Sequence, residues 1–505
     1  MPAPALTRVR AASFGLLLVF AAFFVLTSWS RIDAPFADSD EGINGAVWGA
    51  GSRSLREQGI VDSRFGGVRI DGSKYATHPP LIVVGTAVAE GVAGEHPWTT
   101  RAAAWLGAVA TIPLLYALVR SLGLSEINAT ATTVGALGCH MFLVYGPMLD
   151  TMVVAFPFAL ATALAWHRRW RHERPFTWWA TGLLALATGL AGWQGLFLVG
   201  LCALSLAARA ARRGARAAAD AAPFAVGALV ALVLTLGWTV WTHGDLDVLA
   251  GKLGRRSGAH TTIGQMVDFQ MPWLSQLLGL GLVMVLVCVV ALRARRFRPL
   301  AALSLASVVL YALALREGSG GHQYWNYWGL LPAAVGLAYL LDLIESHLGR
   351  AARRDHPPGA RSASSPGRMS GAVALALAAV LVLANLSQRN DARALIVAGQ
   401  APLRLVASSA LAPGQIELPY VGEPYRPDDW LRYLGGPPGR PLLGPDDLLT
   451  LARDHPDFVV LVLGSCASPD PTAICRGLTS TGRRDGDGPP RIVRADTLAA
   501  RLLQS

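Results

Sequence analysis

The chain has 505 residues, of which 52% are hydrophobic and only 15% are charged, and its mean hydropathy is +0.40. A soluble domain carries about 25% charged residues, so the composition excludes an ordinary soluble protein. The net charge of +11 would suit a nucleic-acid partner. The arginines, however, gather in short segments between apolar runs, which membrane topology explains better. We therefore expect a mainly α-helical, polytopic membrane protein without a nucleic-acid partner.

The apolar runs predict about eleven transmembrane helices of roughly 20 residues each. A large first outer loop is expected over 30–97, and the short apolar run 80–93 within it suits a helix in the membrane interface. If 80–93 crossed the membrane, the Arg-rich segment 167–174 would be exported, against the positive-inside rule. The expected crossings are 11–29, 98–120, 127–147, 151–166, 177–191, 193–208, 222–242, 273–292, 299–315, a span ending near 342, and 371–386.

This topology predicts a multi-pass plasma (inner) membrane protein with a cytoplasmic N-terminus. Residues 346–387 would hold a cytoplasmic linker rich in Arg, Pro and Ser, followed by the last crossing. Residues 388–505 alternate strand-like segments, such as DFVVLVLG, with helix-like segments, such as DDLLTLARDH. They predict a small extracytoplasmic α/β domain. In that location Cys466 and Cys475 could form a disulfide or remain two free thiols.

An acidic stretch, ADSDEGINGAVW (37–48), lies in the first outer loop. Asp38 and Glu41 match a capping box, so these carboxylates could simply begin a helix. A carboxylate such as Asp40 could instead take a proton from an acceptor or bind a metal. Asp150 offers the same two interpretations, because it directly precedes an apolar run and could cap a helix there.

The expected outer loops also collect basic and aromatic residues. Lys, Arg and His side chains can neutralise a phosphate leaving group. Two alternatives stay open: Lys252 and the arginines near it could bind lipid phosphates nonspecifically, and His322 could belong to an aromatic interface belt. Acids and bases on one membrane face suit a reaction on an anionic lipid headgroup. The basic and aromatic members of the set are Lys74, His78, Lys252, Arg255, Arg256, His260, His322 and Tyr324.

The order of several motifs resembles the GT-C glycosyltransferases, in particular protein O-mannosyltransferases and the aminoarabinose transferase that modifies lipid A. The resemblance covers roughly residues 10–345, and the C-terminal region adds little to it. Several relatives carry a lysine where this chain has GLAGWQGLF (189–197). The matching motifs are the Asp40-Glu41 pair, THPPL (77–81), a crossing that opens with Arg within 99–123, Asp150 after the third crossing, and GHQYWNYWGLLP (321–332).

The resemblance implies a GT-C catalytic module over 1–345. It would move a hexosyl or pentosyl group from a polyprenyl-phosphate sugar to a lipid, glycan or protein acceptor on the outer membrane face. Asp40 would be the general base, and Glu41 and Asp150 would orient the acceptor or support a divalent cation. His78, with Lys74 nearby, would hold the donor phosphate.

We further expect Lys252, Arg255 and Arg256 to contact that phosphate, and His322 and Tyr324 to close the pocket. The alternative is a polytopic transporter or a non-catalytic membrane assembly protein. A transporter should place its ionisable residues at mid-membrane depth, often on repeated broken helices. Here they gather in the expected outer loops, which favours the enzyme.

Overall fold

The computed structural model describes most of the first 354 residues and separate parts of the remainder. The described residues are 3–36, 40–70, 72–173, 176–213, 215–258, 261–354, 371–372, 374–376, 378–380, 382–383, 415, 418–421, 439–441, 445–462 and 491–503. They fall into two compact units. The helical unit comprises Met1–Ile32 and Ser54–Arg389, and the C-terminal unit comprises Asp33–Arg53 and Asn390–Ser505. The domain boundaries expected at 345 and 387 stay predictions.

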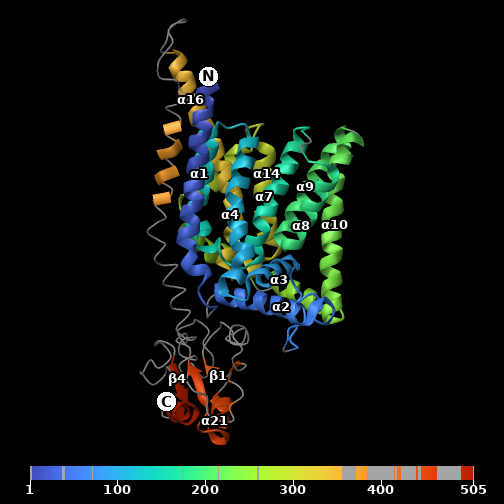
Figure 1. The fold of residues 1–505 in the computed structure, drawn as a ribbon, viewed down its shortest axis with the longest axis vertical. Helices are drawn as coiled ribbons and strands as arrows, with labels where there is room; N and C mark the ends of the chain where they lie inside the picture. The colour runs from blue at the N-terminus through green and yellow to red at the C-terminus, as the bar shows by residue number, and fades with distance from the viewer. Residues whose placement is uncertain are drawn as a thin grey trace. The chain divides into compact units, whose positions relative to one another are not determined.

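The helical unit consists of helices, several of which run side by side (Figure 1). One of them, α2, begins among residues of the other unit. In chain order the helices are α1 (Ala3–Ile32), α2 (Asp40–Asp62), α3 (Leu81–Ala93), α4 (Pro97–Ser121), α5 (Glu126–Leu137), α6 (His140–Tyr145), α7 (Thr151–Trp170), α8 (Trp178–Ala191), α9 (Trp193–Arg213), α10 (Ala215–His243), α11 (Asp247–Arg256), α12 (Ile263–Leu278), α13 (Leu280–Ala291), α14 (Arg298–Ala314), α15 (Arg316–Ser319), the 3₁₀ helix η1 (Gln323–Gly329) and α16 (Leu330–Arg354).

Five helices among the described residues are long and apolar enough to cross a membrane, and the bent pair α12–α13 makes a sixth candidate. A multi-pass helical membrane protein is therefore confirmed, while the count of eleven and the orientation stay predictions. The expected interfacial segment is the helix α3. Its 13 residues span only about 20 Å, less than the roughly 30 Å of a bilayer core. The five long candidates are Val9–Ile32, Pro97–Ser121, Trp193–Arg212, Ala218–His243 and Gln323–Leu348.

Two expected crossings are interrupted. The run 127–147 forms α5 and α6, which are separate helices on either side of Gly138 and Cys139. The run 273–292 is divided between α12 and α13, whose axes bend by 105° at Gly279. Gly279 has φ 54° and ψ −124°, a conformation that is essentially open only to glycine.

Helices also extend into segments that were expected to be irregular. The expected outer loop 243–272 is mostly helical, because it contains α11 and the beginning of α12. Likewise α16 continues to Arg354, so the first part of the expected linker is helical. Residues 355–370 lie outside the described part of the chain.

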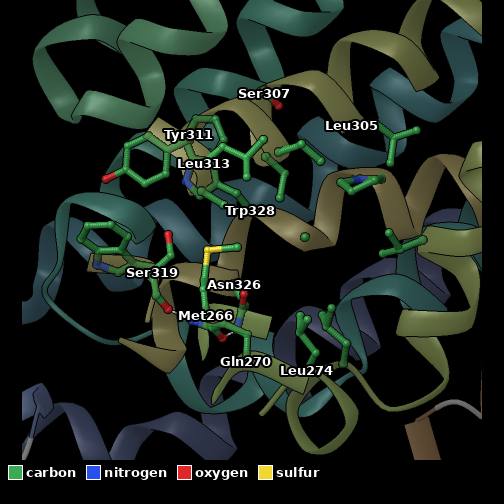
Figure 2. Close-up of a pocket in the computed structure, with 18 of the residues that line it drawn as sticks. Met266, Gln270, Leu274, Leu305, Ser307, Tyr311, Leu313, Ser319, Asn326 and Trp328 are labelled. Atoms are coloured by element: carbon green, nitrogen blue, oxygen red, sulfur yellow. Dashed lines mark hydrogen bonds between the residues drawn. The ribbon is translucent and has the colours of Figure 1, made fainter. Parts of the chain in front are cut away.

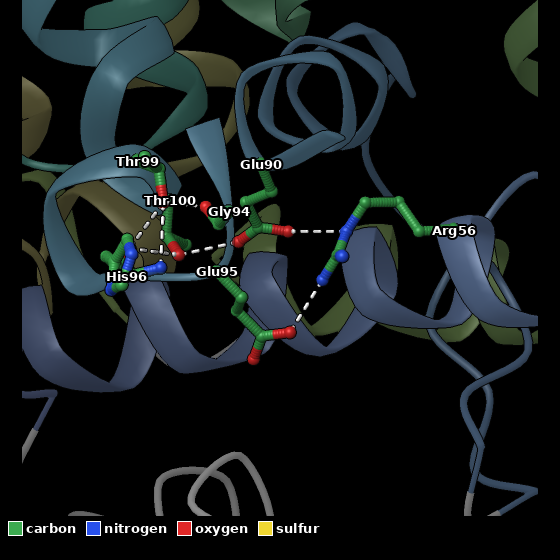
Figure 3. Close-up of polar contacts among 7 residues, drawn as sticks. All are labelled: Arg56, Glu90, Gly94, Glu95, His96, Thr99 and Thr100. Atoms are coloured by element: carbon green, nitrogen blue, oxygen red, sulfur yellow. Dashed lines mark hydrogen bonds and ion pairs between the residues drawn. The ribbon is translucent and has the colours of Figure 1, made fainter. Parts of the chain in front are cut away.

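A buried ionic contact joins α3 to its neighbours (Figure 3). The Glu90 side chain in α3 accepts hydrogen bonds from Arg56 Nε in α2 at 3.1 Å and from Thr100 Oγ1 in α4 at 2.6 Å. Arg56 also donates to Glu95 at 2.6 Å. These contacts join α2, α3 and α4 to one another. The segment 63–80 connects α2 to α3.

The interior of the helical unit lies along α7. Most of its side chains are buried, and it packs against α4, α8, α9 and η1. The ring of Phe156 lies 5.2 Å from that of Tyr327 and 5.9 Å from that of Trp328. Trp328 Nε1 donates to the carbonyl oxygen of Met152 at 3.1 Å. These contacts hold η1 against the first turn of α7.

The C-terminal unit contains a four-stranded sheet with the strand order β2-β1-β3-β4. β1 pairs in parallel with β2 and β3, and β3 pairs antiparallel with β4. Apolar side chains of β3 and the two helices, such as Val460, Leu448 and Leu498, form a buried core. The elements are β1 (Leu418–Val421), β2 (Gly439–Pro441), α21 (Pro445–Asp454), β3 (Val459–Val462), β4 (Arg491–Arg494) and α23 (Ala495–Leu503).

Several elements expected in this region coincide with elements of the structure. The segment 457–464 contains β3, and the segment 446–455 lies within α21 except for its last residue. Cys466 and Cys475 lie outside the described residues. Their pairing and the existence of a separate extracytoplasmic α/β domain therefore stay predictions.

Candidate active site

The short helix α11 carries two cations on one face. Lys252 and Arg256 are four residues apart, which places their side chains next to each other on a helix surface. Both are partly buried, whereas Arg255 is exposed. The helix therefore presents Lys252 and Arg256, and not Arg255, to the protein.

Lys252 contacts the segment that connects α2 to α3. Its Nζ donates to Thr77 Oγ1 at 2.7 Å and to the Tyr75 hydroxyl at 3.3 Å. The ammonium also lies 4.6 Å from the centre of the Tyr75 ring, within the range of a cation–π interaction. The Tyr75 ring stacks at 6.2 Å on the imidazole of His78. Lys252 and His78 therefore both lie against the ring of Tyr75.

The same segment is fixed by hydrogen bonds to its backbone. Trp193 Nε1 donates to the carbonyl of Thr77 at 3.0 Å, and Thr239 Oγ1 donates to the carbonyl of Ala76 at 2.7 Å. Buried carbonyls need such partners. The first turn of α9 and the last turns of α10 therefore determine where His78 lies.

The second histidine, His322, directly precedes η1. Arg256 Nη1 lies 2.7 Å from His322 Nε2, and the guanidinium lies 5.9 Å from the centre of the Trp325 ring. The His322 ring lies 5.4 Å from that of Trp325 and 5.2 Å from that of Tyr324. Gln270 in α12 donates to the carbonyl of His322 at 3.3 Å, which holds this segment in place.

The electrostatics show that the four basic groups act on one another. Burial, and then the charges of Lys252 and Arg256, lower the pKa of His78 well below its usual value, and His322 contributes to the same effect. Burial and the same two cations lower the pKa of His322 to about 4. Both imidazoles are therefore neutral at pH 7. We call Lys252, Arg256, His78 and His322 the cation cluster, after the two cations Lys252 and Arg256.

An apolar pocket of about 260 Å³ lies next to the cation cluster, between α12, α13, α14 and η1. Trp325 lines the pocket and also contacts Arg256 and His322. Figure 2 shows Tyr311 and Ser319 on one side of the pocket and Leu305 on the other. The pocket therefore has an end with polar side chains near Trp325 and an aliphatic end away from it.

The structure separates the expected phosphate-binding residues into two groups. His78, Lys252, Arg256 and His322 converge, and Tyr324 packs against His322. Arg255 and Lys74 have exposed side chains. Lys74 lies in a short antiparallel bridge with Val68.

The structure does not bring the expected acidic residues together in one described unit. Asp150 is 7% exposed, and its carboxylate caps α7 by accepting from the Met152 N–H at 2.8 Å. This is the capping interpretation, and the role of Asp150 in orienting the acceptor stays a prediction. Asp40 and Glu41 begin α2 within the C-terminal unit. His260 and Asp38 lie outside the described residues.

A metal site would need several ligands in one place. Within the described ranges, no group of three or more His, Cys, Asp or Glu side chains is arranged to hold a metal ion. Asp40, Glu41 and Asp150, the expected ligands, belong to two units that are described separately. A divalent cation therefore stays a prediction.

Several residues at the site were missed from the sequence. Tyr75 and Thr77 lie in GSKYATHPPL, in which the charged residues give the stronger sequence signal. Gln194 and Tyr311 lie in runs that were interpreted only as membrane crossings. A polar amide directly after Trp193, in an otherwise apolar hairpin, was the available signal.

Comparisons with known proteins agree with this architecture. ArnT from Cupriavidus metallidurans bound to undecaprenyl phosphate superposes with a TM-score of 0.53 at 15% identity, over 88% of this chain and 88% of that chain. Its apo state gives 0.52 and 16%, over 88% and 89%. The oligosaccharyltransferase AglB from Archaeoglobus fulgidus, in complex with an inhibitory peptide and a dolichol-phosphate, gives 0.50 and 12%, over 85% and 64%.

The chain has the GT-C fold. Both of these structural neighbours are GT-C proteins, and the superpositions cover most of this chain. No protein-family model matches the sequence, and no curated protein sequence matches it significantly. The GT-C resemblance expected from the motifs is thus confirmed at the level of the fold.

Proposed function

We propose that the protein transfers a sugar from a polyprenyl-phosphate donor to an acceptor at the outer membrane face. The observation that carries the proposal is the position of the cation cluster at the polar end of an apolar pocket. Charged and polar groups next to an apolar cavity suit an amphiphile with an anionic head. The GT-C neighbours were solved with undecaprenyl phosphate and with dolichol-phosphate, which supports a ligand of this class here.

In this proposal the cation cluster binds the donor phosphate, and the neighbouring pocket takes the part of the donor next to that phosphate. Arg256 and Lys252 provide the positive charge of the site. When the bond between the anomeric carbon and the phosphate oxygen breaks, negative charge increases on the departing polyprenyl phosphate. Cations already in position stabilise that charge without reorganising.

The acceptor hydroxyl attacks the anomeric carbon from the side opposite the phosphate, with inversion. Its proton passes to a general base, for which we propose Asp40, as the motif resemblance implies. Glu41 and Asp150 would orient the acceptor or hold a divalent cation. The acceptor is a lipid, a glycan or a protein, and the sugar is a hexose or a pentose.

Transfer can be tested with the purified full chain and a synthetic polyprenyl-phosphate hexose, by mass spectrometry of the polyprenyl phosphate released. Asp40→Asn should abolish most of the release, by about 10²–10⁴-fold for a lost general base, and should leave binding of polyprenyl phosphate unchanged. Release at the wild-type rate by Asp40→Asn would contradict the role of Asp40. If the wild type released no polyprenyl phosphate with any class of acceptor, the proposed transferase activity would be contradicted.

One observation would also suit a transporter. The bent pair α12–α13 is a broken helix, a common feature of transporter binding sites. A transporter would move the intact lipid-linked sugar across a vesicle membrane without releasing polyprenyl phosphate. The same mass-spectrometric assay therefore separates the two functions.

A further inference from the structure

The turn between α8 and α9 lies tightly against the start of α7. A Cβ at Gly192 would lie 3.0 Å from the carbonyl oxygen of Thr151, which is tighter than most Cβ contacts. The next residue, Trp193, is fixed by its hydrogen bond to Thr77. The turn thereby fixes Gln194 beside the end of α7 that Asp150 caps.

Gln194 has an unused hydrogen-bond acceptor. Its side chain is 4% exposed and lines the apolar pocket. Its Oε1 is buried and has no hydrogen-bond partner among the described residues. Buried amide oxygens nearly always accept a hydrogen bond. A hydroxyl group of a ligand in the pocket would supply the missing donor.

Tyr311 of α14 lies next to this amide and supplies a hydroxyl. The Gln194 amide acts on the Tyr311 hydroxyl by hydrogen bonding, and the charges of Asp150 and Arg256 both act on the same phenol. The Tyr311 ring also lies 5.3 Å from that of Trp325, which contacts the cation cluster. Tyr311 is therefore within electrostatic reach of the Asp150 carboxylate and of Arg256, and Gln194 lies beside it.

Gln194 and Tyr311 lie in a pocket whose lining is otherwise mostly apolar. None of the described side chains that line it is charged. Its other amides are already used: Asn326 donates to Gln270, and Gln270 donates to the carbonyls of Ser319 and His322. The hydroxyl of Ser307 donates within its own helix, to Ser304. Gln194 and Tyr311 are adjacent polar groups of this lining with capacity for a ligand, and the Ser319 hydroxyl lies in the same lining.

We propose that Gln194 and Tyr311 bind hydroxyl groups of a neutral donor sugar, and that the pocket discriminates against amino sugars and uronic acids. This inference deepens the proposed function and rests on it, because a sugar attached to a phosphate at Arg256 has to lie close to the cluster. An ammonium group here would enter an uncharged lining, where burial of a charge without a partner is costly. The Asp150 carboxylate caps α7 and is not among the residues that line the pocket.

The test measures binding of three ligands to the purified full chain: a polyprenyl phosphate, the same lipid with a neutral hexose, and the same lipid with an amino sugar. The wild type should bind the hexose lipid more tightly than the amino-sugar lipid. Tyr311→Phe and Gln194→Leu should each weaken binding of the hexose lipid about tenfold and change that of the sugar-free lipid less than twofold. Gln194→Glu should shift the preference toward the amino sugar.

The matched control is Ser304→Ala, which removes a fully buried hydroxyl from α14 outside the pocket. It should leave binding of all three ligands unchanged. A wild type that prefers the amino sugar, or variants that weaken the sugar-free lipid as much as the hexose lipid, would overturn the inference alone. No binding of the sugar-free lipid by the wild type would contradict the proposed function, and the inference with it.

Discussion

Arg256 Nη1 lies 2.7 Å from Nε2 of His322. A guanidinium is always protonated and can only donate, so Nε2 has to accept and the imidazole proton belongs on Nδ1. His322 Nδ1 is buried and has no hydrogen-bond partner among the described residues. Arg256 thus holds His322 in a neutral form whose Nδ1–H is an unused hydrogen-bond donor.

This pair predicts a pH dependence of ligand binding. In the free protein the pKa of His322 is lowered to about 4. A bound anion favours the protonated imidazole and raises that pKa, so the complex binds more protons than the free protein between pH 4 and the raised value. Affinity should therefore increase as the pH falls from 7 to 5.

The probe for this measurement is a short polyprenyl phosphodiester, which does not titrate in this range. His322→Gln should make the affinity nearly independent of pH between 7 and 5, apart from the contribution of His78. An affinity that decreases toward pH 5 in the wild type would contradict the arrangement.

The two lysines of the chain should behave differently. Lys252 contacts Thr77 and Tyr75, whereas Lys74 is exposed. Lys252→Ala should raise the donor KM about tenfold, because a charge-assisted hydrogen bond contributes about 1.5–3 kcal/mol. Lys74→Ala, the control, should change it less than twofold. The donor KM is obtained from initial rates at varied donor concentration. Equal increases in KM for the two variants would contradict a contact between Lys252 and the donor phosphate.

The ionic contact of Figure 3 should stabilise the helical unit. The carboxylate side chain of Glu90 is fully buried, and Arg56 forms an ion pair with it at 3.1 Å. Arg56→Ala should lower the free energy of unfolding by about 2–4 kcal/mol, because it removes an ion-pair partner of a buried carboxylate.

Glu95→Ala is the control, since this carboxylate is 26% exposed and contacts the same arginine. A partly exposed ion pair contributes about 0–1 kcal/mol. Thermal unfolding in detergent compares the two variants. A Glu95→Ala shift as large as that of Arg56→Ala would show that burial of Glu90 is not decisive.

The bend between α12 and α13 should depend on Gly279. Alanine at φ 54° and ψ −124° would be strained by about 1–3 kcal/mol. Gly279→Ala should therefore lower the midpoint of thermal unfolding. Gly281→Ala is the control, because a Cβ there would meet its nearest neighbour at an ordinary 3.5 Å. Identical midpoints for the two variants would mean that the bend tolerates a side chain.

The sequence was informative where one local property decides the structure. The apolar run 98–120 predicted α4 closely, and the paired runs around Gly192 predicted α8 and α9. Charge at expected outer loops singled out Lys252 and His322, because an excess of charge near a membrane is a local signal. The folded chain brings these two residues close enough to act on each other electrostatically. The GT-C motifs predicted the fold that the comparisons confirm.

Features that depend on packing between distant segments were not predictable in the same way. The exposed position of Lys74 depends on how the segment 63–80 is fixed to α9 and α10. Gln194 and Tyr311 lie in two different apolar runs. The two residues are 117 positions apart in the sequence and meet only in the folded chain. A hydropathy pattern assigns such residues to a crossing, and it does not show which side chain faces a pocket.

Binding of polyprenyl phosphate to two neighbouring arginine variants tests the central claim most directly. Arg256 contacts His322, while Arg255 on the same helix is exposed. The account predicts that Arg256→Ala weakens binding at pH 7 by at least tenfold, because it removes a charge-assisted contact to the phosphate, and that Arg255→Ala leaves it within twofold. Equal affinities of the two variants for polyprenyl phosphate would contradict a phosphate site at the cation cluster.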